Sequence, residues 1–339
     1  MAEQNRVIDA DGHVRDSEAQ IRQYLEAPYD KRERLGGGSR DGYDNTVGGT
    51  LGIREVDVNT WLDALDSGGL ETAVLYPTGS LGSGFLSEPD FAVARSRAYN
   101  NFLSEEYMKV SPRFKGVALL PAQDPAEAVI ELRRAVTELG MVGGMFAEGP
   151  RLYGKKEFHP VYEEAERLGT MIAIHGGGHL GGTGDEYLFD KFVQVHSLGH
   201  AFVQMKQFVS IIFEGVPAKF PKVRLAFLEA GCGWLAYMLD RMDERYGFRG
   251  EIDAPLLTKT PSEYVMDGNI YLSVEAEERL LPETLRIFGD NNFVYASDFP
   301  HWDSEFPENI QHLLAREDLT EEQRGKITRT NAQALYALS

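Results

Sequence analysis

Residues 6–14 read Arg6-Val-Ile-Asp-Ala-Asp-Gly-His-Val14, an apolar start followed by acidic and imidazole side chains at every second position. Alternate residues of an extended strand share one face, so Asp9, Asp11 and His13 are predicted to point the same way. Burying three such groups is costly unless they are paired or bind a metal ion. Asp11 and His13 are therefore predicted to begin a metal site, although a polar strand end with a hydrogen-bonded histidine explains this stretch alone about equally well.

Beyond this strand, short apolar runs alternate with helical patterns. The runs that predict further strands are 72–76, 114–120, 142–147, 171–175, 223–228, 269–273 and 293–296. The helical patterns are 56–67, 91–110, one from 124, 161–168, 202–216, 234–246, 278–288 and 310–338. Nearly continuous apolar runs are typical of parallel strands that are buried on both faces. Eight β/α units in 339 residues favour an α/β fold, a (β/α)8 TIM barrel that forms a single domain over residues 1–339.

A glycine-rich stretch at residues 36–50 follows a short predicted helix at 16–25. It is too long for an ordinary connection, so we expect an insertion after strand 1, about residues 15–55, that acts as a lid. The stretch contains neither GxGxxG nor GxxxxGK[ST], which makes a phosphate-binding loop a weak alternative.

Composition limits the classes of partner that the protein is expected to bind. The net charge of −19, with no run of Lys or Arg, disfavours nucleic acid and anionic membranes but not a small anionic substrate. Cys232 is the only cysteine, so a disulfide framework and a cysteine-rich zinc motif are excluded. The sequence has no apolar run long enough to cross a membrane and no apolar signal core, and a cytoplasmic location is predicted.

Four predicted strands end in acidic or imidazole residues, and active residues of TIM barrels lie at the C-terminal strand ends. Asp11, His13, His175 and Asp298 would supply two nitrogen and two oxygen donors, a set suited to Zn²⁺ or a neighbouring transition metal. The ordinary alternatives are that His175 caps its strand through backbone hydrogen bonds and that Asp298 initiates a turn.

Other polar residues are candidates around that set. Asp298, Glu229 and His301 could take part in catalysis, the last from a loop where a surface histidine is equally expected. His196 and His200 are four residues apart and would share a helical face, so we expect them to line or pack the site. The candidates for contacting substrate are His179, His200, Arg54 and Trp302.

Five motifs occur in a fixed order along nearly the whole chain. They are Ile8-Asp-Ala-Asp-Gly-His13, Ile172-Ala-Ile-His175, Phe227-Leu-Glu-Ala-Gly231, Tyr295-Ala-Ser-Asp-Phe-Pro300 and Thr330-Asn-Ala-Gln-Ala-Leu-Tyr336. This set resembles the amidohydrolase-related proteins, especially the group around aminocarboxymuconate-semialdehyde decarboxylase. The resemblance implies a TIM-barrel enzyme that holds one divalent ion through His13, His175 and Asp298, with Asp11 in the slot of a family histidine and Asp9 behind the ligands.

Two departures from the family pattern bear on function. Asp11 replaces an imidazole, which leaves Zn²⁺ the expected ion but brings Mn²⁺ into consideration. Glu229 stands where the decarboxylase has a histidine, and a carboxylate is a stronger base but a poorer proton donor. The resemblance implies a homodimer or higher homo-oligomer. It also slightly favours a carboxy-lyase for a small unsaturated or hydroxylated aromatic acid over the other functions. The alternatives are a hydrolase of a lactone, amide or cyclic ester and, from another class, a barrel that binds without turnover.

Overall fold

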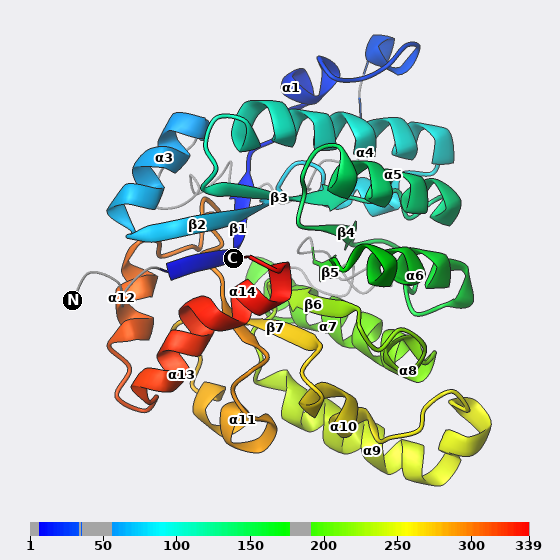
Figure 1. The fold of residues 1–339 in the computed structure, drawn as a ribbon, viewed down its shortest axis with the longest axis vertical. Helices are drawn as coiled ribbons and strands as arrows, with labels where there is room; N and C mark the ends of the chain where they lie inside the picture. The colour runs from blue at the N-terminus through cyan, green and yellow to red at the C-terminus, as the bar shows by residue number, and fades with distance from the viewer. Residues whose placement is uncertain (1–6, 34, 36–55, 177–190, 339) are drawn as a thin grey trace.

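The computed structural model describes residues 7–33, 35, 56–176 and 191–338. Eight parallel strands form one sheet in chain order, each paired with the next along the chain (Figure 1). The strands are β1 Val7–Val14, β2 Leu70–Pro77, β3 Phe114–Leu119, β4 Gly143–Ala147, β5 Met171–His175, β6 Arg224–Leu228, β7 Ile270–Val274 and β8 Phe293–Tyr295. The segment after β8 returns to β1, where His13 N donates to Phe299 O (2.8 Å) and Asp298 N to Asp11 O (3.0 Å). The predicted (β/α)8 TIM barrel is confirmed.

Helices surround the strands and bury their apolar faces against them. The main ones are α3 Val58–Ser67, α4 Pro89–Leu103, α5 Pro125–Thr137, α6 His159–Leu168, α7 Phe192–Phe213, α9 Trp234–Asp253 and α11 Leu281–Phe288. Shorter ones are α1 Glu18–Arg22, α8 Val216–Lys219, α10 Pro261–Met266, α12 Glu308–Leu314, α13 Glu321–Gly325 and α14 Asn331–Tyr336. At α5 the Asp124 side chain caps the helix, because it accepts hydrogen bonds from the backbone of Ala126 and Glu127. None of the described helices combines the length and apolar character needed to cross a bilayer.

Some predicted boundaries were wrong. The predicted helix 202–216 is α7, which begins ten residues earlier, at Phe192, and so contains His196, Gly199 and His200. A single interior glycine costs a helix only about 1 kcal/mol, which packing can offset. The predicted helix 16–25 is only Glu18–Arg22, and the C-terminal helical region is divided into α12, α13, a π-helical turn at Lys326–Thr330 and α14. Residues 36–55 lie outside the described residues, so the lid stays a prediction.

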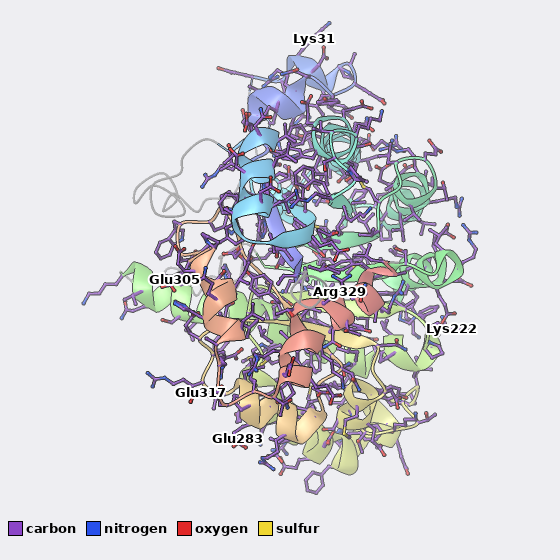
Figure 2. The ribbon with its side chains drawn as sticks, turned by 60° about the vertical axis from the view of Figure 1, so that its left-hand side comes forward. Lys31, Lys222, Glu283, Glu305, Glu317 and Arg329 are labelled. Carbon is purple, nitrogen blue, oxygen red and sulfur yellow. The ribbon has the colours of Figure 1, made fainter. Side chains whose placement is uncertain are left out.

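The last helix, α14, closes one end of the barrel. Arg224, the first residue of β6, donates to Ala334 O (3.0 Å), so α14 lies at the N-terminal strand ends. From there Tyr336 donates to Ala10 O (2.6 Å) and meets the Tyr76 hydroxyl (2.9 Å) inside the barrel. In the side view of Figure 2, Glu305, after β8, and Lys222, before β6, lie on opposite sides of the molecule. The C-terminal strand ends lie on the Glu305 side, and the candidate site residues are found there.

Candidate metal centre

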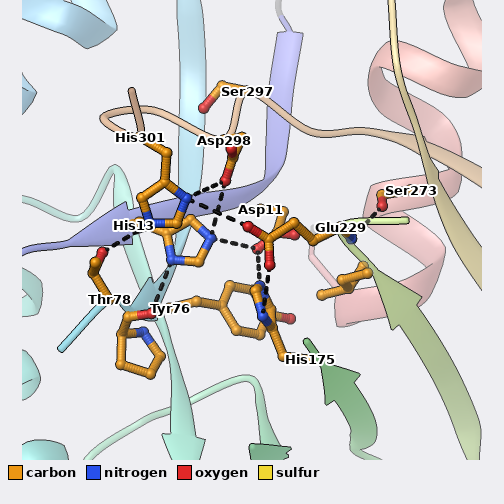
Figure 3. Close-up of polar contacts among 12 residues, drawn as sticks. Asp11, His13, Tyr76, Thr78, His175, Glu229, Ser273, Ser297, Asp298 and His301 are labelled. Carbon is orange, nitrogen blue, oxygen red and sulfur yellow. Dashed lines mark hydrogen bonds and ion pairs between the residues drawn. The ribbon is translucent and has the colours of Figure 1, made fainter. Parts of the chain in front are cut away.

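The C-terminal ends of β1, β5, β6 and β8 bring six polar side chains together (Figure 3). Asp11, His13 and His175 form one group whose ligand atoms lie within 4.8 Å of one another, and we call it the buried half. Glu229, Asp298 and His301, which form a second such group that also includes His13, are called the cleft half. Asp298 is not one of the three members of the buried half, but its Oδ1 lies 3.4 Å from His13 Nε2.

Backbone carbonyls fix the tautomers of the two histidines in the buried half. His13 Nδ1 lies 2.9 Å from Pro77 O, and His175 Nδ1 lies 2.7 Å from Gly176 O. A carbonyl only accepts, so each Nδ1 carries a hydrogen and donates it. This leaves the Nε2 atom of each ring as the ligand atom, as in histidines that bind metals.

The charges of the buried half call for a cation. His13 Nε2 is buried, has no hydrogen-bond partner among the described residues, and lies 3.5 Å from Asp11 Oδ1 and 3.4 Å from Asp298 Oδ1. Burial holds the pKa of His13 well below its ordinary value, so this nitrogen presents a lone pair to two carboxylate oxygens. Burial of Asp11 likewise disfavours its charge and raises its pKa. A divalent ion between these atoms would satisfy all of them, so the residues present fit a metal.

His175 gives the same indication. Its Nε2 lies 3.2 Å from Asp11 Oδ1. Burial alone would lower its pKa, but the carboxylates of Asp11 and Glu229 raise the pKa of His175 to about 9. Without an ion, a proton therefore occupies the position at Nε2 that a metal would take.

The cleft half is built on unusual backbone. Glu229 and Asp298 both have left-handed conformations, with φ of 58° and 54°. Such a conformation costs a non-glycine residue roughly 1–3 kcal/mol and is concentrated at functional sites. It turns both side chains toward His301, whose Nδ1 lies 2.6 Å from Asp298 Oδ1 and 3.4 Å from Glu229 Oε1.

His301 is held as a cation by these two carboxylates. Burial would lower its pKa, but the charges and hydrogen bonds of Asp298 and Glu229 raise the pKa of His301 well above its ordinary value. Burial opposes ionisation of Glu229 as well, yet the imidazoles of His200, His175 and His301 hold its pKa well below the usual range. The cleft half thus pairs a protonated imidazole with an ionised carboxylate.

Asp9 lies behind the ligands rather than beside them. The pairing of β1 with β2 shifts register between Asp9 and Gly12, so the simple alternation that placed Asp9, Asp11 and His13 on one face is broken. Asp9 instead accepts from Ser297 N (2.9 Å), Ser297 Oγ (2.6 Å) and Asp11 N (3.2 Å). Its carboxylate thereby holds the ends of β1 and β8 together.

Gly12 shows why the motif has a glycine between its two ligands. A Cβ there would lie 2.5 Å from the Trp61 ring and 2.8 Å from Asp9 Oδ2. Trp61 in turn donates from Nε1 to His13 O (2.9 Å), which fixes the strand end. Any larger residue would displace the indole from this position.

A cleft of about 620 Å³ opens beside the cleft half. Of the residues predicted to contact substrate, His200 lines it, and so does His196. Trp302 lies next to them, with its ring 5.6 Å from that of His196. His179 and Arg54 lie outside the described residues, and the structure does not place them. Cys232 is buried, as expected for an unreactive thiol, and does not line the cleft.

Thr78 and Asp16 also support the site, although the sequence did not predict them. Thr78 Oγ1 lies 3.1 Å from His301 Nε2, on the far side of the ring from Asp298. Asp16 Oδ1 accepts from the backbone of Thr78 (3.0 Å) and Gly79 (2.6 Å) and so holds this loop. The only signal for Thr78 in the sequence is its position directly after strand 2, because its side chain is neither acidic nor an imidazole.

Comparison with known proteins identifies the family of this chain. The sequence model of the amidohydrolase family matches residues 8–338. A gamma-resorcylate decarboxylase from Rhodococcus jostii is 28% identical over 282 residues, 75% of this chain and 79% of that protein. A 2-amino-3-carboxymuconate-6-semialdehyde decarboxylase from Dictyostelium discoideum is 25% identical over 257 residues, 73% of this chain and 69% of that protein.

A solved structure shares the fold. The 5-carboxyvanillate decarboxylase from Novosphingobium aromaticivorans, complexed with manganese and 4-hydroxy-3-methoxy-5-nitrobenzoic acid, superposes with a TM-score of 0.78. The match covers 100% of this chain and 98% of that one at 19% identity, which establishes a common fold.

Proposed function

Since this chain belongs to the amidohydrolase family, and so to a family of enzymes, we propose that it is a metal-dependent carboxy-lyase that releases CO₂ from a small hydroxylated aromatic carboxylic acid. Similarity to decarboxylases over three quarters of the chain supports this assignment. The observation that carries it is the position of His301, a protonated imidazole held by Asp298 and Glu229 at the mouth of the metal centre.

Four of these residues would hold the metal ion. Asp11, His13 and His175, with Asp298, would hold one divalent ion, and Mn²⁺ and Zn²⁺ both suit this mixed donor set. When bound, the ion supplies a Lewis acid for the substrate's carboxylate and neighbouring oxygen. Manganese in a neighbour of the same fold gives Mn²⁺ the stronger support, while the expectation that zinc comes first stays a prediction.

His301 would deliver the proton. It adds its Nδ1 proton to the ring carbon that bears the carboxylate, the bond from that carbon to the carboxylate then breaks, and the electron pair returns to the ring as CO₂ leaves. The neutral imidazole is reprotonated from the cleft, next to ionised Glu229. General acid catalysis of this kind contributes roughly 10²–10⁴-fold.

The cleft narrows the substrate class. Its volume of about 620 Å³ is within the range of sites for small molecules. The described residues that line it include five acids outside the cleft half, which are Glu275, Glu277, Glu278, Asp303 and Glu305. No Lys or Arg is found among the described lining residues. A second anionic group far from the metal would be repelled, so we propose an acid with a single carboxylate.

Hydrolysis of a lactone, amide or cyclic ester is the second candidate, and Glu229 favours it. Its carboxylate stays ionised, and its Oε2 has no hydrogen bond in the described part of the chain, so it could act as a general base.

A substrate panel separates the two functions. Metal-loaded protein is incubated with monocarboxylic hydroxybenzoates and with lactones, and CO₂ release is measured. We expect CO₂ from a hydroxybenzoate and, in D₂O, deuterium at the carbon that carried the carboxylate. Ring opening of a lactone without any CO₂ release would instead establish the hydrolase.

A further inference from the structure

A buried amide on α7 holds the ends of two neighbouring strands. Gln204 is fully buried, and its Nε2 donates to Ile174 O (2.9 Å) and to Leu228 O (2.8 Å). Ile174 immediately precedes His175 at the end of β5. Leu228 immediately precedes Glu229 at the end of β6. One side chain therefore binds the backbone next to a residue of each half of the metal centre.

The orientation of this amide follows from its partners. Both carbonyls only accept, so the amide nitrogen faces them and the amide oxygen faces away. This oxygen, Gln204 Oε1, is buried and has no hydrogen-bond partner among the described residues. A buried acceptor without a partner lowers the stability of a fold, so packing alone does not account for a glutamine here. Among uncharged side chains, only Asn and Gln donate two hydrogens from one atom, and Gln has the longer reach.

The peptide between Leu228 and Glu229 is held from both sides. Its carbonyl accepts from Gln204, and its N–H donates to the buried Ser273 Oγ on β7 (2.8 Å; Figure 3). Because a peptide unit is planar, two bonds at its opposite edges fix its rotation. That rotation sets the φ of Glu229, which is left-handed at 58°. Side chains of α7 and β7 thus hold the backbone that turns Glu229 toward His301.

The same amide also fixes how the two halves of the metal centre face each other. Strands β5 and β6 pair in register as far as His175, which lies opposite Leu228. Across this pair, His175 Nδ1 lies 3.3 Å from Glu229 Oε2. Because Gln204 spans both strand ends, a shift of either strand would change this distance.

We propose that Gln204 is a positioning residue of the metal centre, which acts through the backbone on His175 and Glu229, and that Ser273 acts with it on Glu229 alone. Neither Gln204 nor Ser273 is among the residues that line the cleft. Gln204 should therefore influence metal affinity through His175 and turnover through Glu229, whereas Ser273 should influence turnover only. The effect on turnover rests on the proposed function, and the effect on metal affinity does not.

A second buried glutamine on α7 provides a matched control. Gln207 Oε1 accepts from Tyr153 N (2.9 Å), and Gln207 Nε2 donates to Arg151 O (2.7 Å). These partners belong to the segment after β4 and neither line the cleft nor belong to the metal centre. Met in place of either glutamine keeps an unbranched side chain of similar size and removes the hydrogen bonds. A difference between the two variants therefore reports the position on α7 rather than the loss of a buried amide.

Metal affinity tests the effect on His175. Competition between the protein and a coloured chelator for Mn²⁺ is measured without substrate, and thermal unfolding shows that each variant is folded. Gln204→Met should raise the dissociation constant for Mn²⁺ about 10–100-fold, the usual effect of removing a group that supports a metal ligand. Gln207→Met and Ser273→Ala should leave this constant unchanged.

Turnover at saturating Mn²⁺ tests the effect on Glu229. Ser273→Ala should lower kcat about tenfold with KM unchanged, whereas Ser273→Thr keeps the hydroxyl and should retain the wild-type kcat. Gln204→Met combined with Ser273→Ala should be little slower than the slower single variant, because both changes release the same peptide, whereas independent effects would multiply. The substrate is whichever acid or lactone of the panel is turned over, so the comparison does not depend on the type of reaction.

Four results would overturn the proposal. Wild-type metal affinity in Gln204→Met, or an equal loss of affinity in Gln207→Met, would remove Gln204 from the positioning of His175. Effects on kcat that multiply in the double variant, or equal kcat in Ser273→Ala and Ser273→Thr, would show that the two side chains do not hold one peptide.

Two further outcomes are distinguishable from these. If Gln204→Met does not fold, Gln204→Asn replaces it, because Asn keeps an amide but lacks the length to reach both carbonyls, and the same loss of metal affinity is expected. Release of CO₂ by the wild-type protein without any of these variant effects would reject the positioning role and leave the proposed function in place. Loss of Mn²⁺ affinity in Gln204→Met with no CO₂ release from any acid would support the positioning role and reject the carboxy-lyase.

Discussion

The two halves of the metal centre share one cavity but are built differently. The side chains of the buried half are 0–1% exposed, whereas those of Glu229, Asp298 and His301 are 10–24% exposed. The buried half lies on regular strand ends, and the cleft half depends on left-handed backbone at Glu229 and Asp298. We infer that the first is a site for a cation, to which Asp298 adds a ligand, and that Glu229 and His301 of the second meet substrate.

Removal of a ligand from the buried half should have the largest effect. His175→Ala should lose the ion and lower kcat at least about 10³-fold, because a metal supplies several kcal/mol and each 1.4 kcal/mol is tenfold. Metal content per chain and kcat are the measurements. His312→Ala, which removes an exposed imidazole, should leave both unchanged. If His175→Ala retained a full equivalent of metal, the assignment of the two halves would fail.

Removal of the acid from the cleft half should separate chemistry from metal binding. His301→Gln should lower kcat about 10²–10⁴-fold, the usual contribution of a general acid, while the metal content remains that of wild type. Loss of metal in this variant would contradict the division, because it would make His301 a ligand. His175→Ala is the control in the same metal assay, because it should lose the metal that His301→Gln retains.

The pH dependence of metal affinity should sharpen the same contrast. In the ion-free protein the proton on His175, whose pKa is raised to about 9, must leave before Nε2 can bind a metal. Affinity should therefore fall about tenfold for each pH unit below 9 and level off above it. Competition with a coloured chelator measures the slope. His301→Gln should keep this slope, and a slope that disappeared there would place the released proton in the cleft half.

The buried half could be predicted from the sequence because it follows periodic rules. Asp11, His13 and His175 stand at the ends of apolar runs, and the ends of parallel strands meet at one face of a barrel. Residues far apart in the chain are thereby brought together without knowledge of any turn. Asp298 follows the same strand-end rule, and the family motifs then added the supporting place of Asp9.

The residues of the cleft half were predicted from the sequence, but their arrangement was not. Left-handed φ at Glu229 and Asp298 contradicts local preference, so no propensity reveals that both side chains converge on His301. The shift of register in β1, which turns Asp9 toward Ser297, depends on pairing with β2 and on the Trp61 ring that packs over Gly12. The early start of α7, which brings His196 and His200 to the cleft, was missed because the expected helix began only at Phe202, although residues 192–200 contain a single glycine.

The smallest effect should come from Thr78, which touches only the far side of His301. Its hydroxyl lies 3.1 Å from His301 Nε2, and one such hydrogen bond is worth about 0.5–1.5 kcal/mol. Thr78→Val keeps the shape and loses the bond, so kcat should fall roughly 2–10-fold with KM and metal content unchanged, whereas Thr78→Ser should retain wild-type kcat. Because Asp16 holds the backbone of this loop in either variant, a difference between Val and Ser reports the bond rather than the fold. Equal kcat in both variants would mean that Asp298 and Glu229 alone orient the imidazole. Thr78 would then have no part in the cleft half.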